Sequence, residues 1–148
     1  MAPPSALLTP TPSLSQPQAG DSDLTPVRRV VLIDSRQERR AITSGLVERC
    51  ALLHVVGLTG TLSEAESQIR GAQADVAIVE IQLPVTQGLA TISALRERFP
   101  ELRIVVCSFH DDAATREAAR THGADGYLTK PVHVDELLGA VLGPAPGA

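Results

Sequence analysis

The sequence is almost without aromatic residues. Its 148 residues include no tryptophan, two phenylalanines and one tyrosine, which are Phe99, Phe109 and Tyr127. The core must therefore be built from aliphatic residues and alanine, and the chain lacks the aromatic platforms on which single-stranded nucleic acid stacks. The net charge of −4 also argues against nucleic-acid binding, which depends on a basic surface.

Cysteines and long apolar stretches are scarce as well. Cys50 and Cys107 lie inside apolar runs and in no Cys-x-x-Cys spacing, which predicts buried free thiols and neither a disulfide nor a metal site. No Lys or Arg precedes Arg28, and no segment is long and apolar enough for a secretory signal or a transmembrane helix. We therefore expect a soluble, cytoplasmic protein that does not contact membranes.

Proline marks off the ends of the chain. Six of the eleven prolines lie within residues 1–26, among Ser, Thr, Gln and Ala, a composition that buries too little apolar surface to offset the entropy of ordering. We predict a disordered tail over 1–26, one domain over 27–142 and a flexible C-terminal tail over 143–148. Hydrophobic residues make up 43% of the chain, enough for a single core. No DNA-binding output domain is expected.

Five short aliphatic runs alternate with five helical patterns between these tails, which is typical of βα units. Strands are predicted over 29–34, 52–58, 76–81, 103–108 and 126–129. Helices are predicted over 37–49, 62–70, 89–98, 112–122 and 134–142. The strands are almost uninterrupted by polar residues, as in parallel sheets covered on both faces. Right-handed crossovers then give a three-layer α/β sandwich.

Three helix ends carry capping signals. Thr61 and Glu64 have the spacing of a capping box, in which each residue satisfies a backbone N–H of the other. Asp111 or Asp112 can cap the fourth helix, and Gly123 suits the left-handed position after it.

Polar residues follow the predicted strands where each one ends. They are Asp34 with Ser35, Glu80, Ser108 and Lys130. Because parallel strands present their carboxyl ends along one edge of the sheet, these side chains are expected to converge there. Each alone has an ordinary explanation: a helix cap for Asp34, a turn hydroxyl for Ser108 and a solvated charge for Lys130. Together, these residues at the ends of four strands predict a site.

The order and spacing of these residues closely resemble those of bacterial response-regulator receiver domains (CheY-like), over about residues 27–142. The resemblance implies a flavodoxin-like, doubly wound (βα)5 fold with a parallel five-stranded sheet of order 2-1-3-4-5. It also implies a role in two-component or phosphorelay signalling, and not that of an enzyme.

The resemblance assigns roles to individual residues. Glu80 takes the phosphoacceptor position, where the family has aspartate, while Ser108 and Lys130 match the hydroxyl and the ammonium that contact the phosphoryl group. Tyr127 matches the aromatic residue whose rotamer reports activation, although a lone tyrosine is equally explained as a packing residue. Pro131 matches the proline of a Lys-Pro bond that is cis in the family.

The loops around Glu80 show further matches and departures. Pro84 and Gly88 match the loop after the acceptor, and Gln87 stands where the family commonly has aspartate.

The charged stretch over residues 36–40 is predicted to be a solvated helix face.

The metal site implied by the resemblance is also altered. Asp34 matches the first of two acids that hold Mg²⁺, but Ser35 offers a neutral hydroxyl in place of the second. Mg²⁺ prefers near-octahedral oxygen ligands that include carboxylates. We expect a site made by Asp34, Glu80 and the backbone carbonyl of Gln82 to be weak or absent, so that Mg²⁺ binding is possible but weakened and no cofactor is required.

Glu80 is longer than aspartate by one methylene, about 1.5 Å, which is enough to spoil the in-line geometry of phosphoryl transfer. Three readings stay open. The carboxylate of Glu80 can reach Lys130 and Ser108 and imitate a partly activated state, the site can be degenerate and kept as a scaffold, or Glu80 can itself be phosphorylated.

The resulting hypothesis is a stand-alone, atypical receiver that acts by protein–protein contact without normal aspartate phosphorylation. Its expected partners are a histidine kinase, another regulator or a target protein, bound through the fourth helix, fifth strand and fifth helix by a monomer or a homodimer. The alternative is a phosphate-accepting single-domain regulator with Mg²⁺-dependent phosphotransfer and slow autodephosphorylation. A flavodoxin-like cofactor-binding enzyme is disfavoured, because residues 34–38 contain no glycine to cradle a pyrophosphate.

Overall fold

Strands and helices alternate along the whole of the computed structural model, which describes residues 26–82 and 85–143. The predicted tails over 1–26 and 143–148 lie outside the described residues except for Pro26 and Gly143, and Pro84 lies outside them too. The strands are β1 (Arg28–Ile33), β2 (Leu53–Thr59), β3 (Val76–Glu80), β4 (Arg103–Ser108) and β5 (Gly126–Thr129). The helices are α1 (Gln37–Glu48), α2 (Leu62–Ala72), α3 (Val85–Arg98), α4 (Ala113–His122) and α5 (Val134–Leu142).

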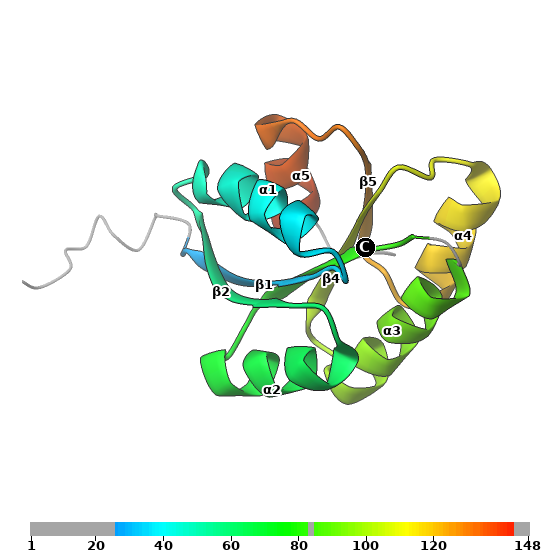
Figure 1. The fold of residues 1–148 in the computed structure, drawn as a ribbon, viewed down its shortest axis with the longest axis horizontal. Helices are drawn as coiled ribbons and strands as arrows, with labels where there is room; N and C mark the ends of the chain where they lie inside the picture. The colour runs from blue at the N-terminus through cyan, green and yellow to red at the C-terminus, as the bar shows by residue number, and fades with distance from the viewer. Residues whose placement is uncertain (1–25, 83–84, 144–148) are drawn as a thin grey trace, which may run out of the picture.

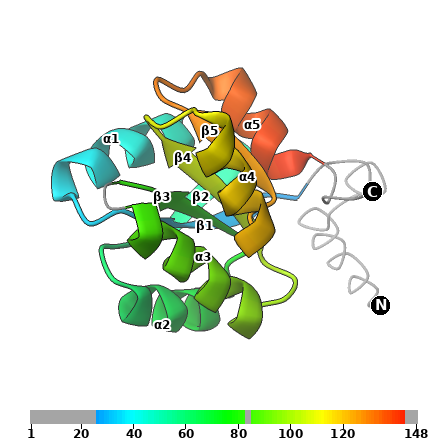
Figure 2. The same ribbon diagram turned by 90° about the vertical axis from the view of Figure 1, so that its right-hand side faces the viewer.

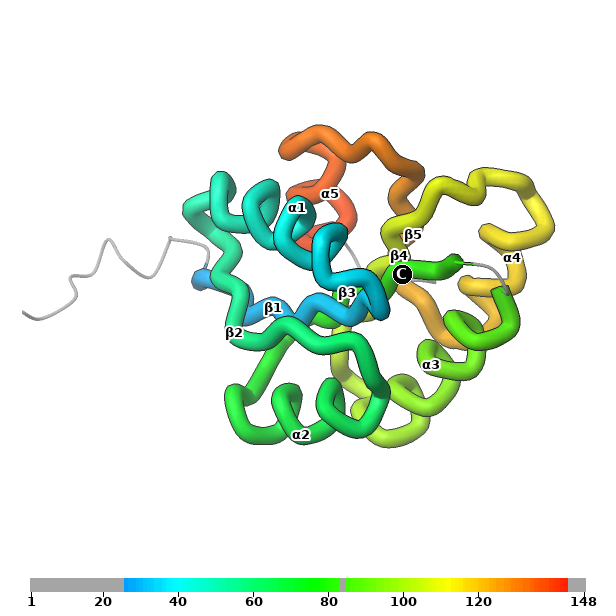
Figure 3. Tube along the Cα trace, viewed as in Figure 1, coloured from blue at the N-terminus to red at the C-terminus, as the bar shows by residue number. Residues whose placement is uncertain are grey.

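The five strands form one parallel sheet of order β2-β1-β3-β4-β5. Figure 1 shows α1 and α5 on one face of the sheet, with α2 and α3 on the other and α4 beside α3. The tube in Figure 3 follows the same path, and the turned view in Figure 2 places α4 in front of β4 and β5. The predicted flavodoxin-like α/β fold is therefore confirmed.

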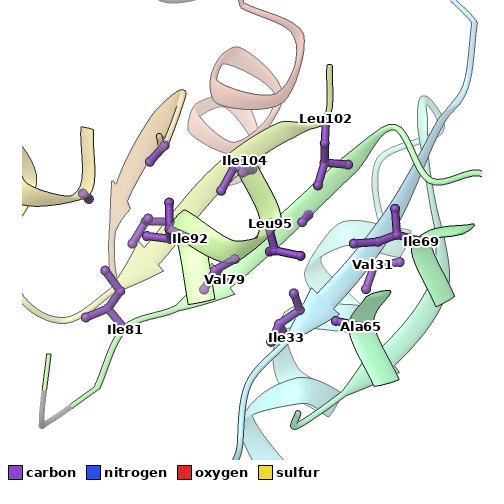
Figure 4. Close-up of a cluster of buried hydrophobic side chains, with 14 residues drawn as sticks. Val31, Ile33, Ala65, Ile69, Val79, Ile81, Ile92, Leu95, Leu102 and Ile104 are labelled. Atoms are coloured by element: carbon purple, nitrogen blue, oxygen red, sulfur yellow. The ribbon is translucent and has the colours of Figure 1, made fainter. Parts of the chain in front are cut away.

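The core consists of two aliphatic layers, one on each face of the sheet. Along β1, Val31 and Ile33 face the layer under α2, α3 and α4, while Val30 and Leu32 face the layer under α1 and α5. The same alternation runs through β3 and β4, because successive strand side chains point to opposite faces. Figure 4 shows the first layer, in which strand residues meet Ile92 of α3.

Helix α3 begins earlier than the sequence predicted. It starts at Val85 and not at residue 89, so Gly88 lies inside its first turn and the prediction that Gly88 belongs to a loop was wrong. A Cβ atom on Gly88 would lie 2.8 Å from Cγ1 of Ile81. The glycine therefore lets the first turn of α3 pack directly against the end of β3. The other boundaries agree with the prediction or differ by at most two residues, as helix and strand ends commonly do.

The helix caps follow the predictions in part. Thr61 accepts a hydrogen bond from the backbone N–H of Glu64, but the Glu64 carboxylate accepts from the hydroxyl of Thr59 at 2.7 Å, so only half of the predicted capping box forms. Asp112, and not Asp111, caps α4 by accepting from the backbone N–H of Thr115. Gly123 ends α4 with a φ of 122°, as its residue type predicted.

No helix among residues 26–82 and 85–143 has both the length and the hydropathy needed to cross a membrane. Cys50 and Cys107 are buried free thiols, as predicted.

Candidate functional site

The strand-end residues lie around the carboxyl edge of the sheet. Glu80 is the last residue of β3 and pairs in register with Cys107, while Ser108 at the end of β4 pairs with Thr129. Asp34 directly follows β1, and its backbone N–H donates to the carbonyl of Thr59 at the end of β2. The parallel topology thus gathers residues that are far apart in the sequence.

Glu80 is held between two cations. Its Oε1 lies 2.5 Å from Nζ of Lys130, and its Oε2 lies 3.4 Å from Nη1 of Arg39. The side chain of Glu80 is only 4% exposed, and that of Lys130 is 12% exposed. The structure therefore brings together the acid and the lysine that the sequence singled out, as a buried ion pair.

Arg39 was missed by the sequence analysis, which treated residues 36–40 as a solvated face. Arg39 lies in the first turn of α1, and this turn begins at the same edge of the sheet as Glu80. Its proximity to a strand-end acid could have been anticipated from that topology, since helices leave a parallel sheet at the carboxyl ends of its strands.

Burial raises the pKa of Glu80 above the usual range of a glutamic acid. The hydrogen bond and charge of Lys130 act in the opposite direction, the carboxylate of Asp34 adds to the rise, and Arg39 opposes it. The charged form of Glu80 thus depends on its cations, because water reaches so little of the carboxylate.

The hydroxyl of Ser108 makes its hydrogen bonds to groups other than the Glu80 carboxylate. Its fully buried hydroxyl donates to the carbonyl of Ile81 at 2.8 Å and accepts from the backbone N–H of His110 at 3.1 Å. Ile81 follows the last residue of β3, so its buried carbonyl lies beyond the ladder and needs another donor. The expectation that Ser108 engages the Glu80 carboxylate was therefore wrong for this conformation.

Asp34 and Gln82 form a hydrogen-bonded pair beside Glu80. Oδ1 of Asp34 accepts from the backbone N–H of Arg36 at 2.9 Å and from Nε2 of Gln82 at 2.8 Å. The Ser35 side chain is exposed, with its Oγ 3.5 Å from the same Nε2. Gln82 thus contributes its side-chain amide here, where the sequence analysis considered only its carbonyl.

These residues fit Mg²⁺ poorly. The carboxylate of Asp34 already accepts two N–H donors, Glu80 is paired with cations, and Ser35 brings no charge. Within the part of the chain that the structure describes, no three His, Cys, Asp or Glu residues are grouped so as to hold a metal ion.

Tyr127 precedes Lys130 in the chain and Pro131 follows it. The hydroxyl of Tyr127 donates to the backbone carbonyl of His110, and the guanidinium of Arg116 lies 4.8 Å from the centre of its ring. Burial raises the pKa of the Tyr127 phenol. The Lys130–Pro131 peptide bond is cis, as the resemblance implied.

Phe109 covers the ion pair from outside. Its ring centre lies 5.6 Å from the guanidinium carbon of Arg39 and 5.3 Å from Nζ of Lys130, so it contacts both cations of Glu80. The Phe109 residue is nevertheless 60% exposed. Sequence reasoning counted it only as a rare aromatic residue.

Comparison with known proteins identifies the family. The sequence model of the response regulator receiver domain family matches residues 30–142. The chain is 32% identical over 114 residues to the DNA-binding transcriptional activator DevR/DosR of Mycobacterium tuberculosis, covering 76% of this chain and 52% of that protein. It is 29% identical over 116 residues to the transcriptional regulatory protein MctR of Rhizobium johnstonii, covering 78% and 54%. The chain spans about half the length of the curated relatives it matches.

Solved structures agree with this assignment. The signal receiver domain of the putative response regulator NarL from Mycobacterium tuberculosis superposes with a TM-score of 0.70 at 28% identity, over 83% of this chain and 99% of that domain. A LuxR-family two-component response regulator from Aurantimonas gives a TM-score of 0.71 at 25% identity, over 80% and 88%. The chain belongs to the response regulator receiver domain family, the signal-receiving module of two-component systems.

Proposed function

We propose that this receiver acts without normal aspartate phosphorylation, with Glu80 in the phosphoacceptor position. The observation that carries the proposal is the buried contact of 2.5 Å between Oε1 of Glu80 and Nζ of Lys130. Lys130 is the cation that the family resemblance assigns to the phosphoryl group. Here it already has a negative partner, supplied by the chain itself.

The imitation of a phosphorylated state is incomplete. A carboxylate carries one charge and two oxygens, whereas a phosphoryl group carries close to two charges and has three oxygens. Arg39 takes up the second oxygen of Glu80, and Ser108 is turned toward the carbonyl of Ile81. We infer that Lys130 is held constitutively by a negative partner, as in a phosphorylated site. The hydroxyl of Ser108 is not engaged in this way.

Weakened Mg²⁺ binding is part of the same proposal. Receiver domains typically use Mg²⁺, which supplies positive charge to the oxygens of the transferred phosphoryl group. Asp34 would be the main ligand here, and Gln82 and Ser35 would bring no further charge. Arg36 and Gln82 instead keep the Asp34 carboxylate hydrogen-bonded.

The receiver would pass on its signal through contact with another protein. Receiver domains interact with kinases and other proteins, and we propose that the partner of this cytoplasmic receiver binds across α4, β5 and α5, to a monomer or a homodimer. Arg116, Glu117 and Arg120 of α4 are exposed on this surface and would select the partner by charge.

Incubation with acetyl phosphate and Mg²⁺, followed by intact-mass measurement, tests the proposal. The wild type and Glu80→Gln should both keep their mass, while Glu80→Asp should gain one phosphoryl group if the added methylene alone blocks transfer. A phosphoryl adduct on Glu80 of the wild type would overturn phosphate independence and favour the phosphate-accepting alternative. If Glu80→Asp stays inert, the variant that also carries Ser35→Asp tests the metal site.

Affinity capture tests the output. Wild type, Glu80→Asp and Glu80→Gln are used as baits, and we expect partners of the wild type to be lost or weakened with Glu80→Gln, which removes the charge while keeping the shape. Capture of identical partners by all three would leave the imitation of phosphate without support and favour a degenerate scaffold.

A further inference from the structure

A groove of about 720 Å³ lies beside the Glu80 site, between α1 and the segment that follows β5. Its volume is within the range of roughly 300–1,000 Å³ that small-molecule sites have. The residues that line it are Arg39, Ile42, Thr43, Gly45, Leu46, Arg49, Cys107, Phe109, Lys130, Pro131 and Val132. The groove therefore runs along the length of α1, from its first turn to Arg49 just after its end.

The walls of the groove are apolar and unusually open to water. Ile42 is 73% exposed and Phe109 is 60% exposed, and these are two of the four large hydrophobic residues that are exposed in the described parts of the chain. Both line the groove, together with Leu46 and Val132. An apolar body that covered them would gain the burial that the chain alone does not provide.

The charged residues in the groove are all of one sign. Arg39, Arg49 and Lys130 line it, and no acidic residue does so among those described. At its base, burial raises the pKa of the Cys107 thiol to about 11, so this residue is a neutral, weakly polar part of the floor at physiological pH. The groove thus offers apolar contact and positive charge together.

The position of Gly45 leaves room for a ligand. A Cβ atom built on this residue meets no other atom within 4 Å, although Gly45 lies in the middle of α1. Glycine lowers the stability of a helix interior relative to alanine. Here its missing side chain widens the groove.

We propose that this groove binds an amphipathic organic anion, with its apolar body against Ile42, Leu46 and Val132 and its carboxylate directed to Arg39 and Lys130. A free carboxylate is the matching group because guanidinium and ammonium groups both bind it through charge-assisted hydrogen bonds. The proposal does not depend on whether Glu80 accepts phosphate.

The ligand would be coupled to Glu80 through shared cations. Arg39 and Lys130 hold the Glu80 carboxylate and also line the groove. A ligand carboxylate would compete with Glu80 for them, so binding and the Glu80–Lys130 pair would weaken each other to the same degree. The groove would then let a small molecule alter the Glu80–Lys130 pair.

Titration of the whole chain with octanoate, followed by ¹H–¹⁵N NMR, tests the site. We expect saturable shifts at the backbone amides of Ile42, Gly45 and Val132. Gly45→Leu should weaken binding by ~10-fold or more, because the leucine side chain would occupy volume that the ligand needs. Gly71→Leu is the matched control, because the helical Gly71 of α2 also has nothing within 4 Å and lies outside the groove, so it should keep wild-type affinity.

Glu80→Gln tests the coupling and the charge. It frees Arg39 and Lys130, so octanoate should bind more tightly than to the wild type, while neutral octan-1-ol should bind both proteins equally. Equal effects of Gly45→Leu and Gly71→Leu, shifts scattered away from α1, or no difference between octanoate and octan-1-ol in their response to Glu80→Gln would overturn the proposal. Failure of octanoate to bind, with loss of captured protein partners in Gly45→Leu, would overturn it in favour of a protein-docking surface.

Discussion

Replacement of Lys130 by methionine isolates the strongest interaction in the site. Methionine keeps an unbranched apolar stem, one atom shorter than lysine, but removes the charge that lies 2.5 Å from Oε1 of Glu80. The carboxylate of Glu80 would remain in place, 4% exposed, with only the more distant Arg39 beside it.

The expected loss of stability follows from the burial of the pair. Removal of one partner from a buried ion pair destabilises a protein by about 3–5 kcal/mol, because it leaves an uncompensated charge. Arg39 still lies 3.4 Å from Oε2, so we expect the lower end, about 3 kcal/mol near neutral pH. A surface pair would lose only about 0–1 kcal/mol, so the magnitude discriminates between a buried and an exposed pair.

The loss should depend on pH in a defined direction. Burial raises the pKa of Glu80, and removal of Lys130 should raise this pKa further. A group with a raised folded-state pKa stabilises the fold below its unfolded pKa, about 4.3 for glutamic acid, and loses that contribution as the pH rises through the raised value. The difference between Lys130→Met and the wild type should therefore be small near about pH 4.5 and full near about pH 7.5.

Urea unfolding followed by far-UV circular dichroism measures this difference, since the chain has no tryptophan for fluorescence. The double variant Glu80→Gln with Lys130→Met is the control, because it removes both members of the pair, leaves no unpaired carboxylate at residue 80 and should recover at least about half of the loss. A loss that is equal at both pH values, or a double variant no more stable than Lys130→Met, would refute the reasoning.

Three further changes probe the fold around the site. Gly45→Ala should stabilise α1 by about 1 kcal/mol in thermal unfolding, because its Cβ meets nothing and alanine is the better helix former; destabilisation would show that the groove is closed. Gly88→Ala should destabilise by about 1–3 kcal/mol in urea, since its Cβ would lie 2.8 Å from Ile81, and an unchanged midpoint would contradict this packing. Hydrogen bonds from Thr115 lower the pKa of Asp112, so Asp112→Ala should lower the unfolding temperature near neutral pH and converge with the wild type as the pH falls below about 4. A gap that widens in acid would argue against this cap.

Regular periodicity explains why the fold was predictable from the sequence. The five aliphatic runs and five helical patterns predicted every element in its place along the chain. The sheet order β2-β1-β3-β4-β5 was implied by the resemblance to receiver domains. The start of α3 was predicted wrongly because Gly88 reads as a turn residue, whereas the structure uses it for close packing against Ile81. Local sequence shows that a residue is small, but not which neighbour requires it to be small.

The site was predictable in its positions and less so in its contacts. Topology alone places Asp34, Glu80 and Lys130 at one edge, because these residues end or follow parallel strands. The partner of Ser108 depends on the buried carbonyl of Ile81, which no pattern reveals. Arg39 was assigned to solvent because a charged helix face is usually solvated, although the sheet topology places the first turn of α1 at the same edge as Glu80.

Phe109 contacts the ion pair of Glu80 and also lines the groove beside α1. An ion pair is stronger where water is excluded, and Phe109 lies over both cations while its own ring stays largely exposed. A molecule that covered this ring would gain the free energy of burying its apolar surface. Because Phe109 also lines the groove beside α1, whatever fills the groove would bury the ring and change the surroundings of Lys130 at the same time. Glu80 thus contacts Arg39 and Lys130 from the end of β3, and the exposed ring of Phe109 contacts the same two cations from the surface.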